Sequence, residues 1–150
     1  MDLNRDFLHQ LYNQHQPKSY QQIEQLFEEN YQKLCRLVPD IRQVQQDRIL
    51  RSPTHADLHL LVESRSAHTG IFNLTHQHQG INKPDIRFKL YLDAKLLETL
   101  SVCNEPMINQ SHPYLAKCSD LDIKYELNIF MQRWLDFCLD HYKDRQWQMQ

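Results

Sequence analysis

An alternation of apolar and polar residues in the second half of the chain constrains its fold more than any other feature. Ile86, Phe88, Leu90 and Leu92 are every second residue, and the residues between them are charged or aromatic. Successive side chains of a β-strand point to opposite faces, so this stretch predicts a strand with one buried and one wetter face. Such a strand is typical of an antiparallel sheet. Three other stretches predict strands of the same sheet: 57–63, 71–75 and 95–102.

Helical periodicity lies on both sides of these strands. Apolar residues recur every three or four positions over 19–38, which predicts a helix that Pro39 ends. A second helix is predicted from near Ser119 to about 142, and the polar tail after it is expected to fray. We therefore expect an α+β fold, with an antiparallel sheet of four or five strands flanked by an N-terminal and a C-terminal helix. Residues 18–150 are expected to form this single domain, and 1–17 an N-terminal helical extension.

Asp93 and Ala94 fit a two-residue turn between the last two predicted strands. This turn would place Lys89 opposite Glu98, two opposite charges across an antiparallel pair. A helix that begins at Ala94 is the rival interpretation.

Composition excludes several classes of protein. The chain has 150 residues and only two glycines, too few for a glycine-rich phosphate loop or a dinucleotide-binding fingerprint. The net charge of −2 argues against a chain built chiefly to bind nucleic acid. No apolar run approaches the roughly 20 residues that span a bilayer, and no signal peptide is recognisable. We expect a cytoplasmic protein with no membrane contact, whose four cysteines are reduced: Cys35, Cys103, Cys118 and Cys138.

Several short runs, in this order, resemble the YqiB-like family of bacterial proteins, a domain of unknown function. The runs are Leu26-Phe27-Glu28-Glu29-Asn30-Tyr31, Val62-Glu63-Ser64, Leu90-Tyr91, Asp93-Ala94, Trp134-Leu135 and Cys138-Leu139. The resemblance covers about residues 20–142. It implies a fold but brings no catalytic residue, because the family has no established activity.

Chemical motifs are scarce. His55, His59, His76 and His78 form a histidine-rich region, but their spacing matches no standard zinc signature, so we assign no metal and no cofactor. No nucleophile motif occurs, and we assign no catalytic residue. Glu63 ends a predicted strand, where an ion pair with an arginine is a simpler role than that of a general base.

The wetter face of the sheet is the best candidate for a binding site. Arg87, Lys89 and Tyr91 share it with Leu96 and Leu100, a mixture that is too apolar for a purely solvated surface. This pattern predicts a small protein-interaction or adaptor module rather than an enzyme, with an unknown protein partner or a second copy bound to that face. Two alternatives stay open: the helix predicted over 1–16 covers this face, or the protein binds or converts a small molecule in a pocket near Glu63.

Asn30 and Asn128 lie on the margins of the apolar stripes of the two helices. Asparagine is unfavourable inside a helix, and an unpartnered buried amide costs about 1–3 kcal/mol. We therefore predict that both are at least half-buried and bonded to the backbone of a strand or loop. The alternative is that both line a ligand pocket.

Overall fold

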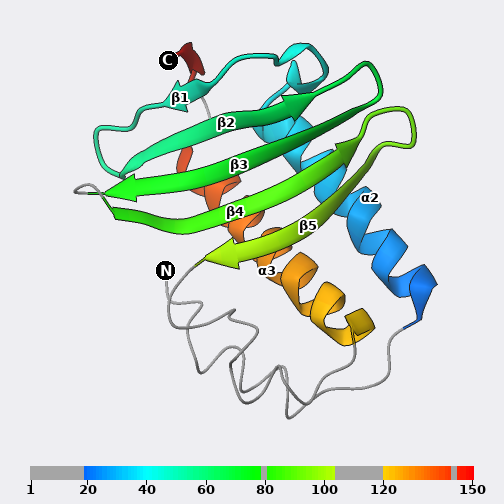
Figure 1. The fold of residues 1–150 in the computed structure, drawn as a ribbon. Helices are drawn as coiled ribbons and strands as arrows, with labels where there is room; N and C mark the ends of the chain where they lie inside the picture. Colours follow the sequence, from blue (N-terminus) through cyan, green and yellow to red (C-terminus); the bar gives the residue numbers. More distant parts are fainter. Residues whose placement is uncertain (1–18, 79–80, 104–119, 143–144) are drawn as a thin grey trace.

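The structure is a computed structural model that describes residues 19–78, 81–103, 120–142 and 145–150 (Figure 1). These residues form two α-helices, one short 3₁₀ helix and six strands. In chain order they are α2 (Tyr20–Leu37), η1 (Ile41–Gln43), β1 (Arg48–Leu50), β2 (Asp57–Arg65), β3 (Thr69–His78), β4 (Ile81–Tyr91), β5 (Leu96–Cys103), α3 (Asp120–Tyr142) and β6 (Gln148–Met149). The predicted extension over 1–17 lies outside the described residues.

The strands form one antiparallel sheet in the order β5-β4-β3-β2-β1-β6. The α+β class is confirmed, but the predicted number of four or five strands is wrong. The two missed strands, β1 and β6, have three and two residues, too few for an alternation to be recognised. The tail does not fray as predicted, because Gln148 and Met149 pair with β1 and Trp147 packs against the core.

Both helices lie on the same face of the sheet (Figure 1). They run parallel to each other, since Glu29 bonds to Gln132 and Lys33 to Asp136 one turn further along both helices. The sheet residues beneath them are almost fully buried: Leu58, Leu60, Phe72, Leu74, Ile86, Phe88, Leu90 and Leu97. None of the described helices covers the opposite face, which points to the viewer in Figure 1 and which we call the open face.

Local signals explain where α2 begins. Ser19 and Gln22 form a capping box, in which the Ser19 hydroxyl accepts the Gln22 amide and the Gln22 side chain accepts the Ser19 amide. The predicted start of the last helix agrees with the observed start at Asp120, although Ser119 itself lies outside the described residues.

The predicted β4–β5 hairpin is confirmed in register but not in the form of its turn. Lys89 lies opposite Glu98 and Leu90 opposite Leu97, which rules out a helix that begins at Ala94. The connection has four residues, Leu92 to Lys95, rather than two. Lys95 has a φ of 59°, whereas a two-residue turn of the predicted type needs positive φ at both Asp93 and Ala94.

Candidate functional site

The open face carries two cross-strand rows in its middle. One row runs Leu61, Asn73, Arg87 and Ser101, and the next runs Ile71, Lys89 and Glu98. Four aliphatic side chains lie between these polar groups and remain partly exposed: Leu61, Ile71, Leu96 and Leu100. The face is therefore neither a second core layer nor a fully polar surface.

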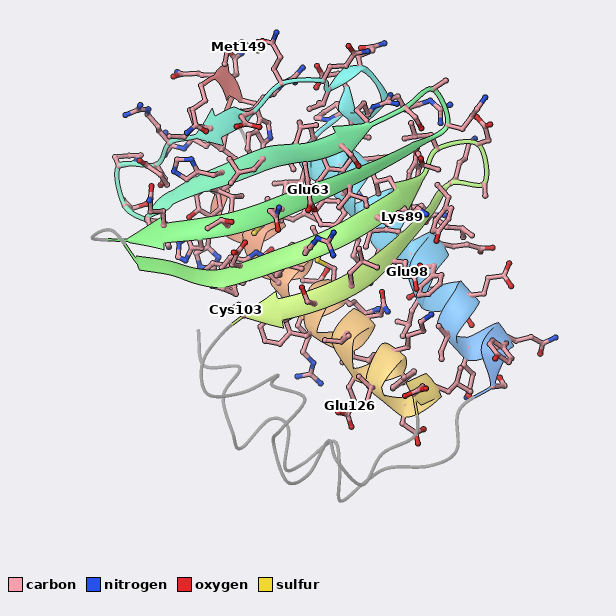
Figure 2. All side chains as sticks on the ribbon, viewed as in Figure 1. Glu63, Lys89, Glu98, Cys103, Glu126 and Met149 are labelled. Carbon is pink, nitrogen blue, oxygen red and sulfur yellow. The ribbon has the colours of Figure 1, made fainter. Side chains whose placement is uncertain are left out.

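Glu63 and Arg87 form a two-point ion pair on this face. The register of β2 shifts between Val62 and Ser64, so Glu63 is the extra residue of a bulge and points outward (Figure 2). The Arg87 Nε–H donates to Glu63 Oε2 at 2.7 Å, and Nη2 donates to Oε1 at 3.1 Å. The bond from Arg87 lowers the pKa of Glu63, and both side chains are more than 40% exposed (43% and 42%). Glu63 is thus held as an anion.

Tyr91 and Glu98 form a second polar group near the β4–β5 turn. The Tyr91 hydroxyl donates to Glu98 Oε1 at 2.9 Å, and the Lys124 ammonium of α3 lies 2.9 Å from Glu98 Oε2. Burial and the bond to Glu98 raise the pKa of Tyr91 to about 12. Burial raises the pKa of Glu98, but the bonds from Lys124 and Tyr91 outweigh it and lower the pKa overall.

Lys89 does not form the ion pair with Glu98 that the register favours. Its ammonium instead lies 4.8 Å from the centre of the Tyr91 ring, within the range of a cation–π contact. Figure 2 shows Lys89 and Glu98 on neighbouring strands. The structure therefore brings Glu63, Arg87, Lys89 and Tyr91 together on one face. The sequence predicts a shared face for Arg87, Lys89 and Tyr91, but it does not place Glu63 there.

Asn30 and Asn128 lie elsewhere, between α2, α3 and β5. Both side chains are fully buried. Asn128 Oδ1 accepts the Thr99 amide of β5 at 3.1 Å, as predicted, and its Nδ2 donates to the Lys124 carbonyl at 2.7 Å. The predicted strand or loop partner of Asn30 is wrong, because Asn30 Nδ2 donates to the Asn128 carbonyl, which belongs to α3. The Asn30 amide therefore joins the two helices to each other.

Two histidines of the predicted histidine-rich region, His55 and His76, both lie against Phe137 and Tyr142, with ring centres 5.9 to 6.3 Å apart, whereas His59 lies on the other face of the sheet. His59 lies in the open-face row between Ile49 and Thr75, with Nδ1 3.1 Å from Gln150 Oε1. His76 lies near Trp134 beneath the helices, and His55 lies 4.6 Å from His141, ring centre to ring centre. Within 19–78, 81–103, 120–142 and 145–150, no group of three or more suitable side chains could hold a metal ion.

The cysteines that the structure describes do not pair. Cys35, Cys103 and Cys138 are all free thiols, and Cys118 lies outside the described residues. Burial raises the pKa of Cys35 and Cys138, which disfavours the reactive thiolate at both positions.

Glu126 is an unusual residue that the sequence analysis missed. It belongs to α3, is 3% exposed, and neither of its carboxylate oxygens has a hydrogen-bond partner among the described residues. Burial and the nearby Asp122 raise its pKa to about 7. Its only sequence signal is its position four residues after Asp122, and that spacing is ordinary in a helix.

A family model described as a protein of unknown function (DUF1249) matches residues 33–144. No curated protein and no solved structure matches the chain. Among the helices of the described residues, none has the length and apolarity needed to cross a membrane.

Proposed function

We propose that this chain, which belongs to the DUF1249 family of proteins of unknown function, is an interaction module that binds a protein partner on the open face of its sheet. One observation carries the proposal. Both described helices cover one face, whereas the other displays partly exposed Leu61, Ile71, Leu96 and Leu100 among charged groups. A mixture of aliphatic, aromatic and arginine side chains is typical of protein interfaces.

The polar groups of the open face support this function because they are already ordered. Arg87 is fixed by Glu63 at two points, and Tyr91 is fixed by Glu98. Arginine and tyrosine often contribute most of the binding energy of an interface. Side chains that are held in place before binding lose less conformational entropy when a partner docks.

The alternative of an enzyme with its site at Glu63 has less support. A general base works best with a pKa near the working pH, and burial is the usual way to raise that of a glutamate. Glu63 has the opposite environment, since it is exposed and its pKa is lowered by Arg87.

We also propose three properties that the sequence predicts. The chain is a YqiB-like protein, it is bacterial and cytoplasmic, and it consists of a domain of 18–150 with an extension of 1–17. Most of the residues that resemble the YqiB-like family lie within the matched range 33–144.

The test replaces one aliphatic residue of the open face by a charged one. Tagged full-length chain carrying Ile71→Glu is expressed in the cell of origin, with Tyr20→Glu as the matched control, because Tyr20 is 79% exposed on α2, away from the open face. Proteins bound after chemical crosslinking are identified by mass spectrometry, and sedimentation of the purified chain detects a second copy. Circular dichroism and thermal unfolding confirm that both variants fold.

We expect a partner or a second copy with the wild type and with Tyr20→Glu, and its loss with Ile71→Glu. Equal recovery with both variants would contradict the proposal. A wild-type chain that is monomeric and recovers no protein would contradict it as well.

A further inference from the structure

A pocket of about 620 Å³ lies at the end of the molecule where α2 and α3 both finish. Because the helices are parallel, their C-terminal ends lie together, and β1 and the last residues of the chain complete the walls. Its apolar lining includes Leu37, Leu139 and Trp147. Its charged lining consists of three arginines and one acid: Arg36, Arg48, Arg145 and Asp40.

The charges of this pocket do not balance. Arg48 Nη1 donates to both oxygens of Asp40, at 2.8 and 2.7 Å, so these two groups neutralise each other. Arg36 and Arg145 are exposed, and neither forms an ion pair within the part of the chain that the structure describes. The ends of the two helices contribute about half a negative charge each, which offsets only part of two guanidinium charges. The pocket is therefore positive in a chain whose net charge is −2.

Its aromatic walls are fixed by hydrogen bonds to backbone carbonyls. The Trp147 indole N–H donates to the Leu37 carbonyl at 2.9 Å, and the Tyr142 hydroxyl donates to the Ala56 carbonyl. Since the only donor of the indole is used, Trp147 can offer a ligand the surface of its ring alone. The pocket is thus formed before any ligand arrives.

We propose that this pocket binds a small molecule that carries a phosphate or carboxylate group. Arg36 and Arg145 bind the oxyanion, because the planar guanidinium group matches two oxygens at once. The Trp147 ring packs against the remainder of the ligand. This site is separate from the open face, since its lining residues do not include Glu63, Arg87, Lys89 or Tyr91.

The two tryptophans of the chain provide a direct readout. Trp147 lines the pocket, whereas Trp134 is 2% exposed and belongs to the core, so each gives one indole N–H signal in a ¹H–¹⁵N spectrum. Full-length chain is titrated with pyrophosphate and, separately, with citrate, both at constant ionic strength. We expect a saturable shift of the Trp147 signal and of the Arg36 and Arg145 Nε–H signals, while the Trp134 signal stays in place. The tighter of the two probes identifies phosphate or carboxylate as the preferred group.

Charge-matched variants distinguish a built site from general attraction. Arg145→Gln is the main variant, because Arg36 also lines a second pocket beside Cys35 and Lys95. Arg51→Gln is the control, since Arg51 is exposed and lines neither pocket. We expect about tenfold weaker binding or more for Arg145→Gln, as for the loss of a charged hydrogen bond, and no change for Arg51→Gln.

Two results would overturn this inference. One is the absence of a saturable shift at Trp147 with either probe. The other is equal weakening by Arg145→Gln and Arg51→Gln, which would show that the anions respond to surface charge alone.

Discussion

At the scale of single residues, Asn128 connects three parts of the fold. Its side chain bonds to the Thr99 amide of β5 and to the Lys124 carbonyl of its own helix, and its carbonyl accepts the amide of Asn30 on α2. The bonds to Thr99 and Asn30 are buried, and an unpartnered polar group is costly there. The two asparagines therefore determine how the helix pair sits on the sheet.

Removal of the Asn128 side chain is expected to destabilise the protein. Asn128→Ala leaves the Thr99 amide buried without its partner, so we expect a loss of about 1–3 kcal/mol in the free energy of unfolding. Asn30→Ala is expected to cost less, because within the described part of the chain its side chain makes one bond and its buried Oδ1 has no partner. Urea denaturation measures both, with exposed Gln32→Ala as the control. An Asn128→Ala variant as stable as the control would show that this connection contributes nothing.

At the scale of elements, the β4–β5 hairpin is held by its strands rather than by its turn. Lys95 adopts a positive φ of 59°, which costs a residue with a Cβ roughly 1–2 kcal/mol. Glycine has no such penalty, although it loses about 0.5–1 kcal/mol through backbone entropy. The apolar pair Leu90 and Leu97 and the bonds of the ladder keep the register in place.

Lys95→Gly is therefore expected to stabilise the chain by up to about 1 kcal/mol. Ala94→Gly is the matched control, because Ala94 is the neighbouring turn residue and has no positive φ. This control is expected to lower stability by about 0.5–1 kcal/mol through backbone entropy. Thermal unfolding measures the stability of each variant relative to the wild type. The same sign of change in both would mean that the turn is not strained at Lys95.

Helix α3 contains a titratable group that makes stability depend on pH. The pKa of Glu126 is about 7 in the folded chain, whereas the ordinary pKa of a glutamate is 4.5. The main cause of this difference is the burial of the carboxyl group. Below about pH 4.5 the group is protonated in both folded and unfolded chains. As the pH rises from there to about 7, the unfolded chain loses the proton first, so this group progressively disfavours folding.

Glu126→Gln is expected to remove that dependence. The variant and the wild type should be similarly stable at pH 4.5, and the variant more stable at pH 8 by at most about 3 kcal/mol, the equivalent of the pKa shift. Urea denaturation at both pH values measures this difference, with exposed Glu24→Gln as the control. A variant that is less stable than the wild type at pH 8 would mean that the ionised carboxylate is favourable where it lies.

The long elements were predictable and the short ones were not. Strand β4 alternates over enough residues to be recognised, and α2 has both its capping box and Pro39. Strands β1 and β6 are too short for such a pattern, and β6 forms only where Gln148 and Met149 meet Ile49 and Arg48, about 100 positions earlier. Similarly, register predicted the position of Glu98 but not its partner, since Lys124 reaches it from α3.

At the scale of the whole molecule, the sheet has two different faces. Periodicity showed which residues of each helix are apolar, but it contains no information on which face of the sheet each helix covers. Both helices cover one face, so Glu63 and Lys89 lie on the face that they leave open (Figures 1 and 2), whereas Asn30 and Asn128 lie between the helices and β5. The buried Glu126 carboxyl and the pocket lined by Arg36 and Arg145 were not predicted, for a related reason. Both depend on which helices and strands lie next to each other in the fold.

The open face as a docking surface is the central claim, and a photo-crosslinker at Ile71 tests it most directly. The residue is replaced in the full-length chain by a photoreactive amino acid in the cell of origin, and the same replacement at Tyr20 is the control. We expect a discrete adduct of higher mass from position 71 and none from position 20, whether the partner is another protein or a second copy. No adduct from position 71, or a link from it only to residues 1–17 of the same chain, would contradict the claim.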